Sequence, residues 1–345
     1  MDGRTDPPSE FPTPAPGVSV IMPVLDEERH LAEAVQSILA QDFAGEVEVV
    51  IALGPSSDRT DAIAADLVAS DPRVRTVPNP TGRTPNGLNA AIAATTYDVI
   101  VRSDGHCVLP ADYVRTAVET LARTGADNVG GVMAAEGESI FEQAVARAMT
   151  SRLGVGGATF HIGGEEGAVE TVYLGSFRRA ALERVGGYDE SFLRAQDWEM
   201  NHRIRESGGQ VWFTPDLRVS YRPRPDLRRL ARQYFEYGRW RPVVMARHPE
   251  TVTRASAVRY LAAPVAVLGV TAGTVAGIAG TIGPQWLRLG WSVPGAYAVL
   301  IVGGSAVTGR GLPAAAWVRL PLVYAAMHGA WGAGFLTSPR ALRGR

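Results

Sequence analysis

The 345-residue chain contains no lysine, so all 34 of its Lys-plus-Arg residues are arginines. It contains a single cysteine, Cys107, which excludes an intrachain disulfide and does not imply an oxidising compartment. The first turn between an apolar run and a helical pattern reads PVLDEE and lacks the G-x-G-x-x-G fingerprint of dinucleotide binding. This absence argues against a nicotinamide-dependent oxidoreductase.

Acidic residues are absent from the last part of the chain. Residues 251–345 carry eight arginines and no acid, a balance of +8, whereas residues 1–250 carry 26 arginines and 35 acids, a balance of −9. The formal net charge of −1 therefore describes neither part. An acidic N-terminal part argues against a nucleic-acid partner.

Charge is also missing from three long segments near the C-terminus. They are Tyr260–Ile282, Leu289–Gly309 and Leu320–Ser338, with 23, 21 and 19 residues. A bilayer core of about 30 Å needs about 20 apolar residues in one helix. The first two segments predict membrane-spanning helices. The third is a weaker candidate, because it follows Arg319 directly and contains His328, which we interpret as a polar packing contact. The alternative is a pair of buried core helices.

The arginines around these segments predict an orientation. Arg247, Arg254 and Arg259 precede the first segment, and Arg310 and Arg319 follow the second. Since cytoplasmic loops are enriched in arginine, we expect a multi-pass protein of the cell inner (plasma) membrane whose N-terminal part is cytoplasmic. A third span would put the terminal arginines outside, against this rule, so the choice between two and three spans stays open.

Before these segments, short apolar runs alternate with helical patterns. Strands are predicted at Val18–Pro23, Val47–Leu53, Arg73–Val77 and Asp98–Ser103, and helices at Glu28–Ala40, Asp58–Ser70 and Pro85–Thr95. This alternation predicts βαβ units and a mostly parallel sheet buried on both faces. Ligands of such sheets bind beyond the carboxyl ends of the strands. Those ends are followed by Pro23–Glu27, Gly54–Asp58, Pro78–Arg83 and Asp104–His106.

The stretch VRSDGHCVLP places Asp104 and His106 directly after the fourth predicted strand. Residues two apart in an extended chain can point their side chains to one side. This geometry suits a divalent cation that bridges two phosphates of a nucleotide. Histidine suits Mn²⁺ somewhat better than Mg²⁺. By spacing alone, an ordinary turn with a surface histidine is the more common interpretation.

Four segments, in this order, resemble family 2 glycosyltransferases of the GT-A fold. They are VSVIMPVLDEERHLAEAVQSIL at Val18–Leu39, GRTPNGLNAAI at Gly82–Ile92, the stretch Val169–Pro215 and RQYFEYGRWR at Arg232–Arg241. The nearest type is the membrane-attached, succinoglycan-synthesis-like bacterial group, and the resemblance covers about Val18 to Arg247. It implies an α/β GT-A catalytic domain with a Rossmann-like, mostly parallel sheet, followed by transmembrane helices.

The resemblance implies roles for single residues on the donor side. The segment that holds the base and ribose of the donor nucleotide is matched by Pro23, Asp26 and Glu27, and the region near the diphosphate by Arg83 and Asn89. The DxD metal motif, for Mn²⁺ or Mg²⁺, is matched by Asp104 and His106, with histidine in the second acidic place. Asp104 is thereby also a nucleotide-sugar contact.

On the acceptor side, the resemblance makes Asp197 of QDWE the catalytic base of the ED motif. The acceptor-side turn is matched by Gly187, Tyr188 and Asp189, and the RW pair by Arg239 and Trp240. Glu199 is a candidate for orienting the acceptor or Asp197. The alternative for QDWEMNHRIRE is a solvated helix whose acids pair with Arg203 and Arg205.

Three departures from the family pattern matter. Leu53 stands where the family often has an aspartate, so a nucleotide contact is missing or Asp58 replaces it. Gln196 replaces the first acid of the ED pair. Gln233 lies six residues before Arg239, which is not the QxxRW spacing and weakens a claim of processive synthesis.

Glycosyl transfer needs a base for the acceptor hydroxyl and a charge sink for the leaving nucleotide. With Asp197 as the base and a cation at Asp104 and His106, we expect an inverting, metal-dependent glycosyltransferase. Its expected substrates are a nucleotide-sugar, first of all a UDP-sugar, and a lipid-linked or growing surface glycan at the cytoplasmic membrane face. Other glycan-assembly proteins are further candidate partners. Two alternatives stay open: a polyprenyl-phosphate glycosyltransferase and a non-catalytic membrane scaffold.

The predicted organisation has five parts. They are a disordered segment at residues 1–17, the GT-A domain at 18–223, an amphipathic juxtamembrane region at 224–258, a transmembrane region of two to three helices at 259–338 and a basic tail at 339–345. The basic and aromatic residues of the juxtamembrane region are typical of a helix on a membrane surface.

Overall fold

The computed structural model describes residues 17–339. The predicted disordered segment therefore lies outside the described residues except for Gly17, and the predicted basic tail except for Pro339. The chain divides into two compact units. The first contains residues 17–134 and Gly163–Ser220, and the second contains Ala135–Ile162 and residues 221–339. The segment Ala135–Ile162 thus groups with the C-terminal helices, although it lies within the predicted boundaries of the catalytic domain.

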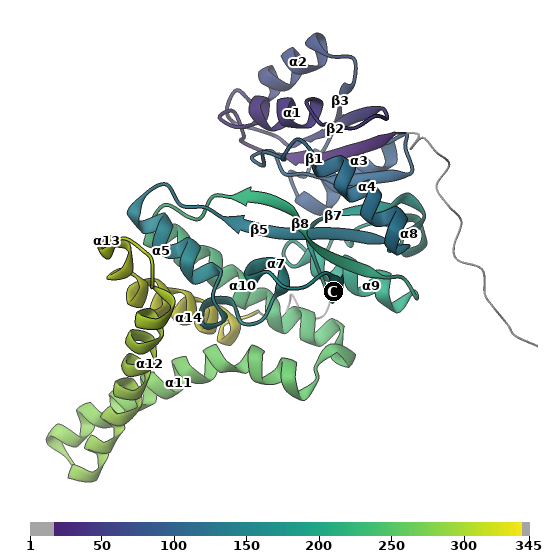
Figure 1. Ribbon diagram of the computed structural model, residues 1–345. Coiled ribbons are helices and arrows are strands. Elements are labelled where there is room, and N and C mark those ends of the chain that lie inside the picture. Colours follow the sequence, from purple (N-terminus) through teal and green to yellow (C-terminus); the bar gives the residue numbers. More distant parts are fainter. Residues whose placement is uncertain (1–16, 340–345) are drawn as a thin grey trace, which may run out of the picture. The chain divides into compact units, whose positions relative to one another are not determined.

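An eight-stranded sheet organises the first unit, which Figure 1 shows with most of its strands labelled. The strand order is β3-β2-β1-β4-β7-β5-β8-β6. The strands are β1 (Val18–Val24), β2 (Val47–Leu53), β3 (Val74–Pro78), β4 (Val99–Arg102), β5 (Asn128–Ala135), β6 (Gly167–Ala168), β7 (Tyr173–Arg178) and β8 (Val211–Tyr221). The first four pair in parallel. By contrast, β7 runs antiparallel to β4 and β5, and β6 runs antiparallel to β8.

Helices cover both faces of this sheet. They are α1 (Leu31–Leu39), α2 (Thr60–Ser70), α3 (Thr84–Ala94), α4 (Tyr113–Thr124), α8 (Arg179–Val185) and α9 (Gln196–Glu206). Because side chains alternate along a strand, β1 sends Val20 and Met22 into a core formed with α1, α2 and α4. Ile21 faces the other core, which is formed with α3, α8 and α9. The predicted α/β fold with its buried sheet is confirmed.

Predicted and observed elements differ in two respects. Helix α1 begins at Leu31 and not at Glu28, because the backbone N–H groups of Glu27 and Glu28 donate to Thr60 and Asp58. The antiparallel half of the sheet was not predicted. The four predicted strands are joined by helical crossovers, and such crossovers join parallel strands.

The second unit is helical in its described part, apart from the last residue of β5 and of β8. Its helices are α5 (Ile140–Met149), α6 (Arg152–Val155), α7 (Thr159–Ile162), α10 (Leu227–Arg247), α11 (Arg254–Ile282), α12 (Ser292–Thr308), α13 (Ala314–Trp317) and α14 (Leu320–Leu336). Two 3₁₀ helices, η1 (Pro249–Thr251) and η2 (Gln285–Trp291), connect some of them.

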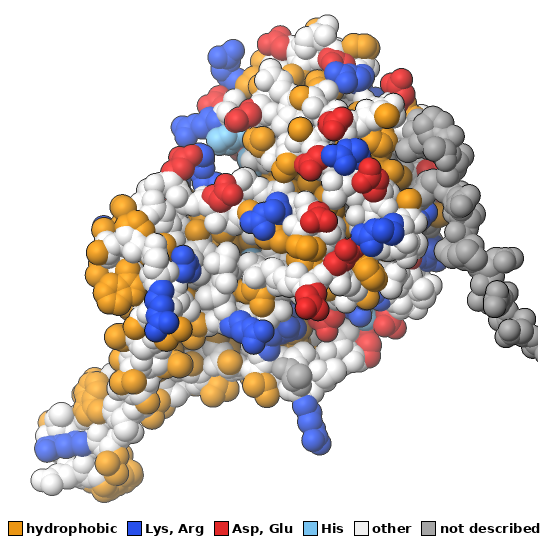
Figure 2. Space-filling view, viewed as in Figure 1, with side chains coloured by type: hydrophobic (Ala, Val, Ile, Leu, Met, Phe, Trp, Pro, Cys, Tyr) orange, Lys and Arg blue, Asp and Glu red, His pale blue; other side chains and the backbone are white. Residues whose placement is uncertain are grey.

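Two helical segments in this unit are long and apolar enough to cross a membrane. They are Ser256–Ile282 and Gln285–Thr308, and only 17% and 11% of their most apolar windows are buried. The low burial distinguishes both from the core helices of a soluble protein. Figure 2 shows apolar side chains crowded over the hairpin that α11, η2 and α12 form.

Helix α14, which contains the third apolar segment, packs closely inside the second unit. A Cβ added to Gly334 would lie 2.0 Å from the backbone oxygen of Phe235 in α10, and one added to Gly332 would lie 2.7 Å from that of Ala263 in α11. Small residues permit such close helix contacts. His328 of α14 lies 2.8 Å from the carbonyl oxygen of Leu153 through Nε2. The prediction that His328 is a polar packing contact is thereby confirmed.

Candidate active site

The loops after β1 and β2 are tied together at the carboxyl edge of the sheet. Asp26 has a φ of 55°, which is unusual for a residue other than glycine, and its Oδ1 accepts a hydrogen bond of 2.7 Å from the backbone N–H of Ser57. Both carboxylate oxygens of Asp58 are also engaged, by the N–H groups of Thr60 and Glu28. Asp58, the predicted replacement for the aspartate missing at Leu53, thus joins the two loops to each other.

Arg102, the last residue of β4, is the centre of the site. Only 5% of its side chain is exposed, and its guanidinium contacts two carboxylates, that of Asp104 at 3.2 Å and that of Asp197. Burial alone lowers the pKa of Arg102, but Asp197 and Asp104 more than reverse this and leave it well above the usual range. Arg102 is not among the site residues predicted from the sequence. The pattern that could have indicated it is a charged residue at the end of the apolar run VIVR, where a buried strand was predicted.

Asp197 lies in the first turn of α9, and 29% of its side chain is exposed. It follows Ala195, whose φ of 61° places a residue other than glycine in the left-handed region just before the helix. Burial raises the pKa of the Asp197 carboxyl above its usual 3.8; Arg102 opposes the rise and Asp104 adds to it. A carboxylate with a raised pKa is better suited to accept a proton near neutral pH.

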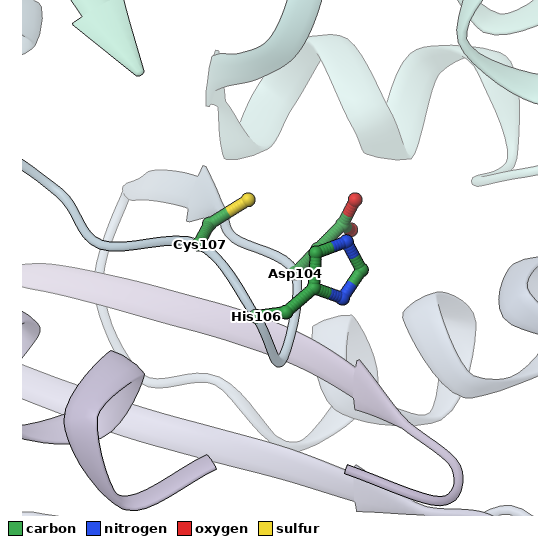
Figure 3. Close-up of side chains that lie close together, drawn as sticks. All are labelled: Asp104, His106 and Cys107. Carbon is green, nitrogen blue, oxygen red and sulfur yellow. The ribbon is translucent and has the colours of Figure 1, made fainter. Parts of the chain in front are cut away.

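Asp104 and His106 lie on the loop after β4, together with Cys107 (Figure 3). One potential ligand atom of each residue lies within 4.8 Å of those of the other two. Burial, followed by the charge of Asp104, raises the pKa of the Cys107 thiol to about 12, so it stays protonated and is a poor ligand. The remaining carboxylate suits Mn²⁺ or Mg²⁺, and the imidazole favours Mn²⁺ of the two.

Glu27 was expected to contact the nucleotide. In the structure its carboxylate contacts His106, the residue expected to bind the metal. Its Oε1 lies 2.7 Å from Nδ1 of His106. A carboxylate on one ring nitrogen orients the imidazole for a metal at the other nitrogen. Gly105 permits this approach, because a Cβ there would lie 3.1 Å from Cγ of Glu27.

Asn89 joins α3 to the predicted acceptor-side turn. Its side chain accepts a hydrogen bond of 2.8 Å from the backbone N–H of Tyr188 and donates one of 2.8 Å to the carbonyl of Tyr188. Gly187 has a φ of 75°, and a Cβ added to it would lie 2.7 Å from Oδ1 of Asn89. Tyr188 itself is 3% exposed. Asp189 accepts a hydrogen bond from the backbone N–H of Ser191 within the same turn.

The other predicted residues are distributed around this centre or lie in the second unit. Pro23 is in β1, and Arg83 is exposed just before the N-terminus of α3. Glu199 is 2% exposed and pairs with Arg203 at 2.6 Å, as the alternative interpretation of this helix predicted for one of its acids. Arg239 and Trp240 lie in α10, in the second unit.

Comparisons with known proteins agree with this architecture. Residues 19–186 match the family model described as Glycosyl transferase family 2. The chain is 33% identical to the succinoglycan biosynthesis protein ExoA of Rhizobium meliloti (strain 1021), over 92% of this chain and 93% of that protein. It is 23% identical to the dolichyl N-acetyl-alpha-D-glucosaminyl phosphate 3-beta-D-2,3-diacetamido-2,3-dideoxy-beta-D-glucuronosyltransferase of Methanococcus voltae, over 64% of this chain and 71% of that protein.

Among solved structures, the mannosyltransferase PcManGT from Pyrobaculum calidifontis, in complex with GDP-Man and Mn²⁺, has a similar fold. The TM-score is 0.60 at 22% identity, over 92% of this chain and 88% of that one.

Proposed function

From the premise that this chain belongs to glycosyltransferase family 2, we propose that it is an inverting, metal-dependent enzyme. Its donor is a nucleotide-sugar, first of all a UDP-sugar. Its acceptor is the hydroxyl of a lipid-linked or growing surface glycan at the cytoplasmic face of the membrane. The single observation that carries the proposal is the cluster in which the buried Arg102 joins two partly exposed carboxylates, those of Asp104 and Asp197.

In the proposed reaction, Asp197 accepts the proton of the acceptor hydroxyl. The hydroxyl oxygen then forms a bond to the anomeric carbon of the donor sugar, while the bond from that carbon to the phosphate oxygen breaks. Its electron pair leaves with the nucleoside diphosphate. One base opposite the leaving group gives a single displacement, and therefore inversion at the anomeric carbon.

Asp104 and His106 would hold the divalent cation, which when bound offsets the negative charge of the leaving diphosphate. Glu27 orients His106 for this purpose. The exposed Arg83, beside the N-terminus of α3, offers further positive charge to the diphosphate. The Mn²⁺ in the complex of the similar mannosyltransferase supports this choice of metal.

A polyprenyl-phosphate acceptor would carry its own negative charge and would need no base. The raised pKa of Asp197 favours a group that takes up a proton, and hence a hydroxyl acceptor. The biosynthesis of succinoglycan by the relative from Rhizobium meliloti supports a glycan acceptor of this kind.

For the membrane attachment, we propose that α11 and the segment Gln285–Thr308 cross the bilayer as a hairpin of two spans. Both ends of the hairpin would then lie on the cytoplasmic side, together with Arg254, Arg310 and Arg319, as the preference of arginine for cytoplasmic loops requires. With α14 packed inside the second unit, the proposal needs no third span.

Cysteine labelling in whole cells tests this topology. A cysteine at Gln285, in the hairpin tip, is expected to react with a membrane-impermeant maleimide from outside. A cysteine at the exposed Ala314 is expected to react only after the membrane is opened. The natural Cys107 is 1% exposed and supplies the unlabelled control. Equal labelling at both positions in intact cells would contradict two spans.

A donor screen tests the catalytic part of the proposal. Membranes that contain the protein are given UDP-glucose, UDP-galactose, UDP-N-acetylglucosamine or GDP-mannose, and nucleotide release is measured with Mn²⁺ or with a chelator. We expect release from one donor class that depends on Mn²⁺. Release that is the same in the chelator would remove the proposed metal dependence.

A further inference from the structure

Arg102 lies where a buried parallel sheet normally carries an apolar side chain. It pairs with Ile21 in the register of β4 on β1, and its neighbours Ile100 and Val101 are fully buried. A buried guanidinium is strongly destabilising unless carboxylates or hydrogen-bond acceptors compensate its charge. Here the compensation comes from two residues with proposed roles in the reaction, Asp104 and Asp197.

The two carboxylates approach Arg102 from different parts of the chain. Asp104 follows β4 directly, whereas Asp197 is 95 residues from Arg102 in sequence and stands in the first turn of α9. Nη1 of Arg102 contacts Asp197, and Nη2 contacts Asp104, so one planar group fixes both. A guanidinium can make this forked contact, whereas the compact ammonium of lysine cannot.

We infer that Arg102 is the positioning residue for the catalytic base: its guanidinium holds the Asp197 carboxylate in place at the end of β4 and couples it to Asp104. This inference rests on the proposed roles of Asp104 and Asp197. Arg102 acts through Asp197 and need not contact the acceptor. A cation bound at Asp104 competes with Arg102 for that carboxylate, and the guanidinium contact to Asp197 remains.

A positioning role for Arg102 affects the binding of Mn²⁺ and the rate of transfer differently. Loss of Arg102 removes a positive charge beside Asp104, so Mn²⁺ binding is expected to stay at least as tight as in the wild type. Loss of Arg102 also leaves Asp197 without its partner, so the transfer step slows. A merely structural arginine would instead weaken metal binding and turnover together when it is removed.

The variants are Arg102→Gln and Arg102→Lys, with Arg184→Gln as the matched control. Arg184 also pairs with an aspartate in the first unit, Asp127 at 2.9 Å, outside the proposed site. Each full-length protein is assayed in membranes with the donor that the wild type uses in the screen above. Binding of Mn²⁺ and UDP is measured by calorimetry on detergent-solubilised protein.

For Arg102→Gln we expect kcat to fall about 100-fold, within the range for impaired acid–base catalysis, with the donor KM and the Mn²⁺ affinity essentially unchanged. Arg102→Lys is expected to recover part of the kcat and Arg184→Gln to match the wild type.

If Arg102→Gln does not fold, Arg102→Lys decides: a reduced kcat with normal Mn²⁺ binding supports the inference. Wild-type kcat in either Arg102 variant, or parallel losses of Mn²⁺ binding and kcat, overturns it. A wild type that releases no nucleotide overturns the proposed function instead.

Discussion

The arginines of the first unit and those that follow residue 250 differ in the partners within reach. In the first unit, Arg102 and Arg203 pair with carboxylates. After residue 250, in the second unit, Arg288 donates to the carbonyl oxygen of Gly280 and Arg319 donates to that of Ala315. The acids are all in the first 250 residues, so these later arginines have no carboxylate in their own segment and bond to backbone oxygens that helix ends leave open.

The apolar side chains of the two units also differ, in how far they are exposed. In the first unit they fill two cores on either side of the sheet. In the second, Leu289 is 75% exposed and Val299 is 74% exposed, in the segment that we propose as a membrane span. In the first unit the charged cluster therefore lies beside two closed apolar cores, whereas the second unit exposes an apolar surface of the kind that suits lipid.

Removal of the proposed base in the first unit is expected to have the largest effect. Asp197→Asn is expected to lower transfer by about 10²–10⁴-fold, the usual contribution of a general base, while donor binding persists. The exposed Asp216→Asn is the matched control and should be silent. Steady-state nucleotide release and calorimetry with UDP measure the two effects. Near-normal turnover in Asp197→Asn would remove the assignment, and would favour a phosphate acceptor.

The metal ligands come next in expected effect. We expect His106→Ala to raise the Mn²⁺ concentration needed for half-maximal activity about 10–100-fold, as loss of a ligand or its supporting shell does. The thermal stability should change little, because His106 is exposed. Glu27→Gln is expected to act in the same direction with a smaller effect. An unchanged Mn²⁺ requirement in His106→Ala would leave Asp104 as the proposed ligand and return His106 to the turn.

The pH dependence of kcat tests whether the pKa of Asp197 is raised in the folded protein. Its pKa is raised by burial, and its ionised form is the active base, so activity should fall as the pH drops through that raised pKa. Below the pKa the decline should approach tenfold per pH unit, as for loss of one essential proton acceptor. Rates with saturating Mn²⁺ and donor give the profile. An acidic limb at or below the ordinary 3.8 would contradict the buried environment.

The acceptor-side turn gives the smallest expected effect. Gly187→Ala places a side chain at a positive φ and against Asn89, and should reduce the free energy of unfolding by about 1–2 kcal/mol. Gly186→Ala, also at a positive φ but with no atom within 4 Å of its added Cβ, controls for the backbone strain alone. Denaturant unfolding of the two variants compares them. Equal losses would mean that the contact with Asn89 adds nothing.

Much of the first unit could be predicted from the sequence. The apolar runs predicted β1 to β4 within two residues at each end, since a parallel sheet buried on both faces requires such runs. Four ordered segments predicted the family, which ExoA and the family model confirm. The hydrophobic segments also predicted the two helices that are long and apolar enough to cross a membrane.

The rest depends on contacts between residues far apart in sequence. No local pattern indicates that Glu27 contacts His106 or that Asn89 holds Tyr188. The pairing of Arg102 with Asp197 spans 95 residues and could only have been suspected from a charge in an apolar strand. The length of the third apolar segment likewise could not reveal that α14 packs on α10 through Gly334.

The proposed enzyme uses the cluster of Asp104, Arg102 and Asp197 to transfer a sugar from a nucleotide donor. The most direct test of this proposal is nucleotide release from the panel of UDP- and GDP-sugars by membranes that contain either the wild type or Asp197→Asn, with and without Mn²⁺. We expect release that requires both Mn²⁺ and Asp197. Release that persists unchanged without either, or no release from any donor by the wild type, would contradict it.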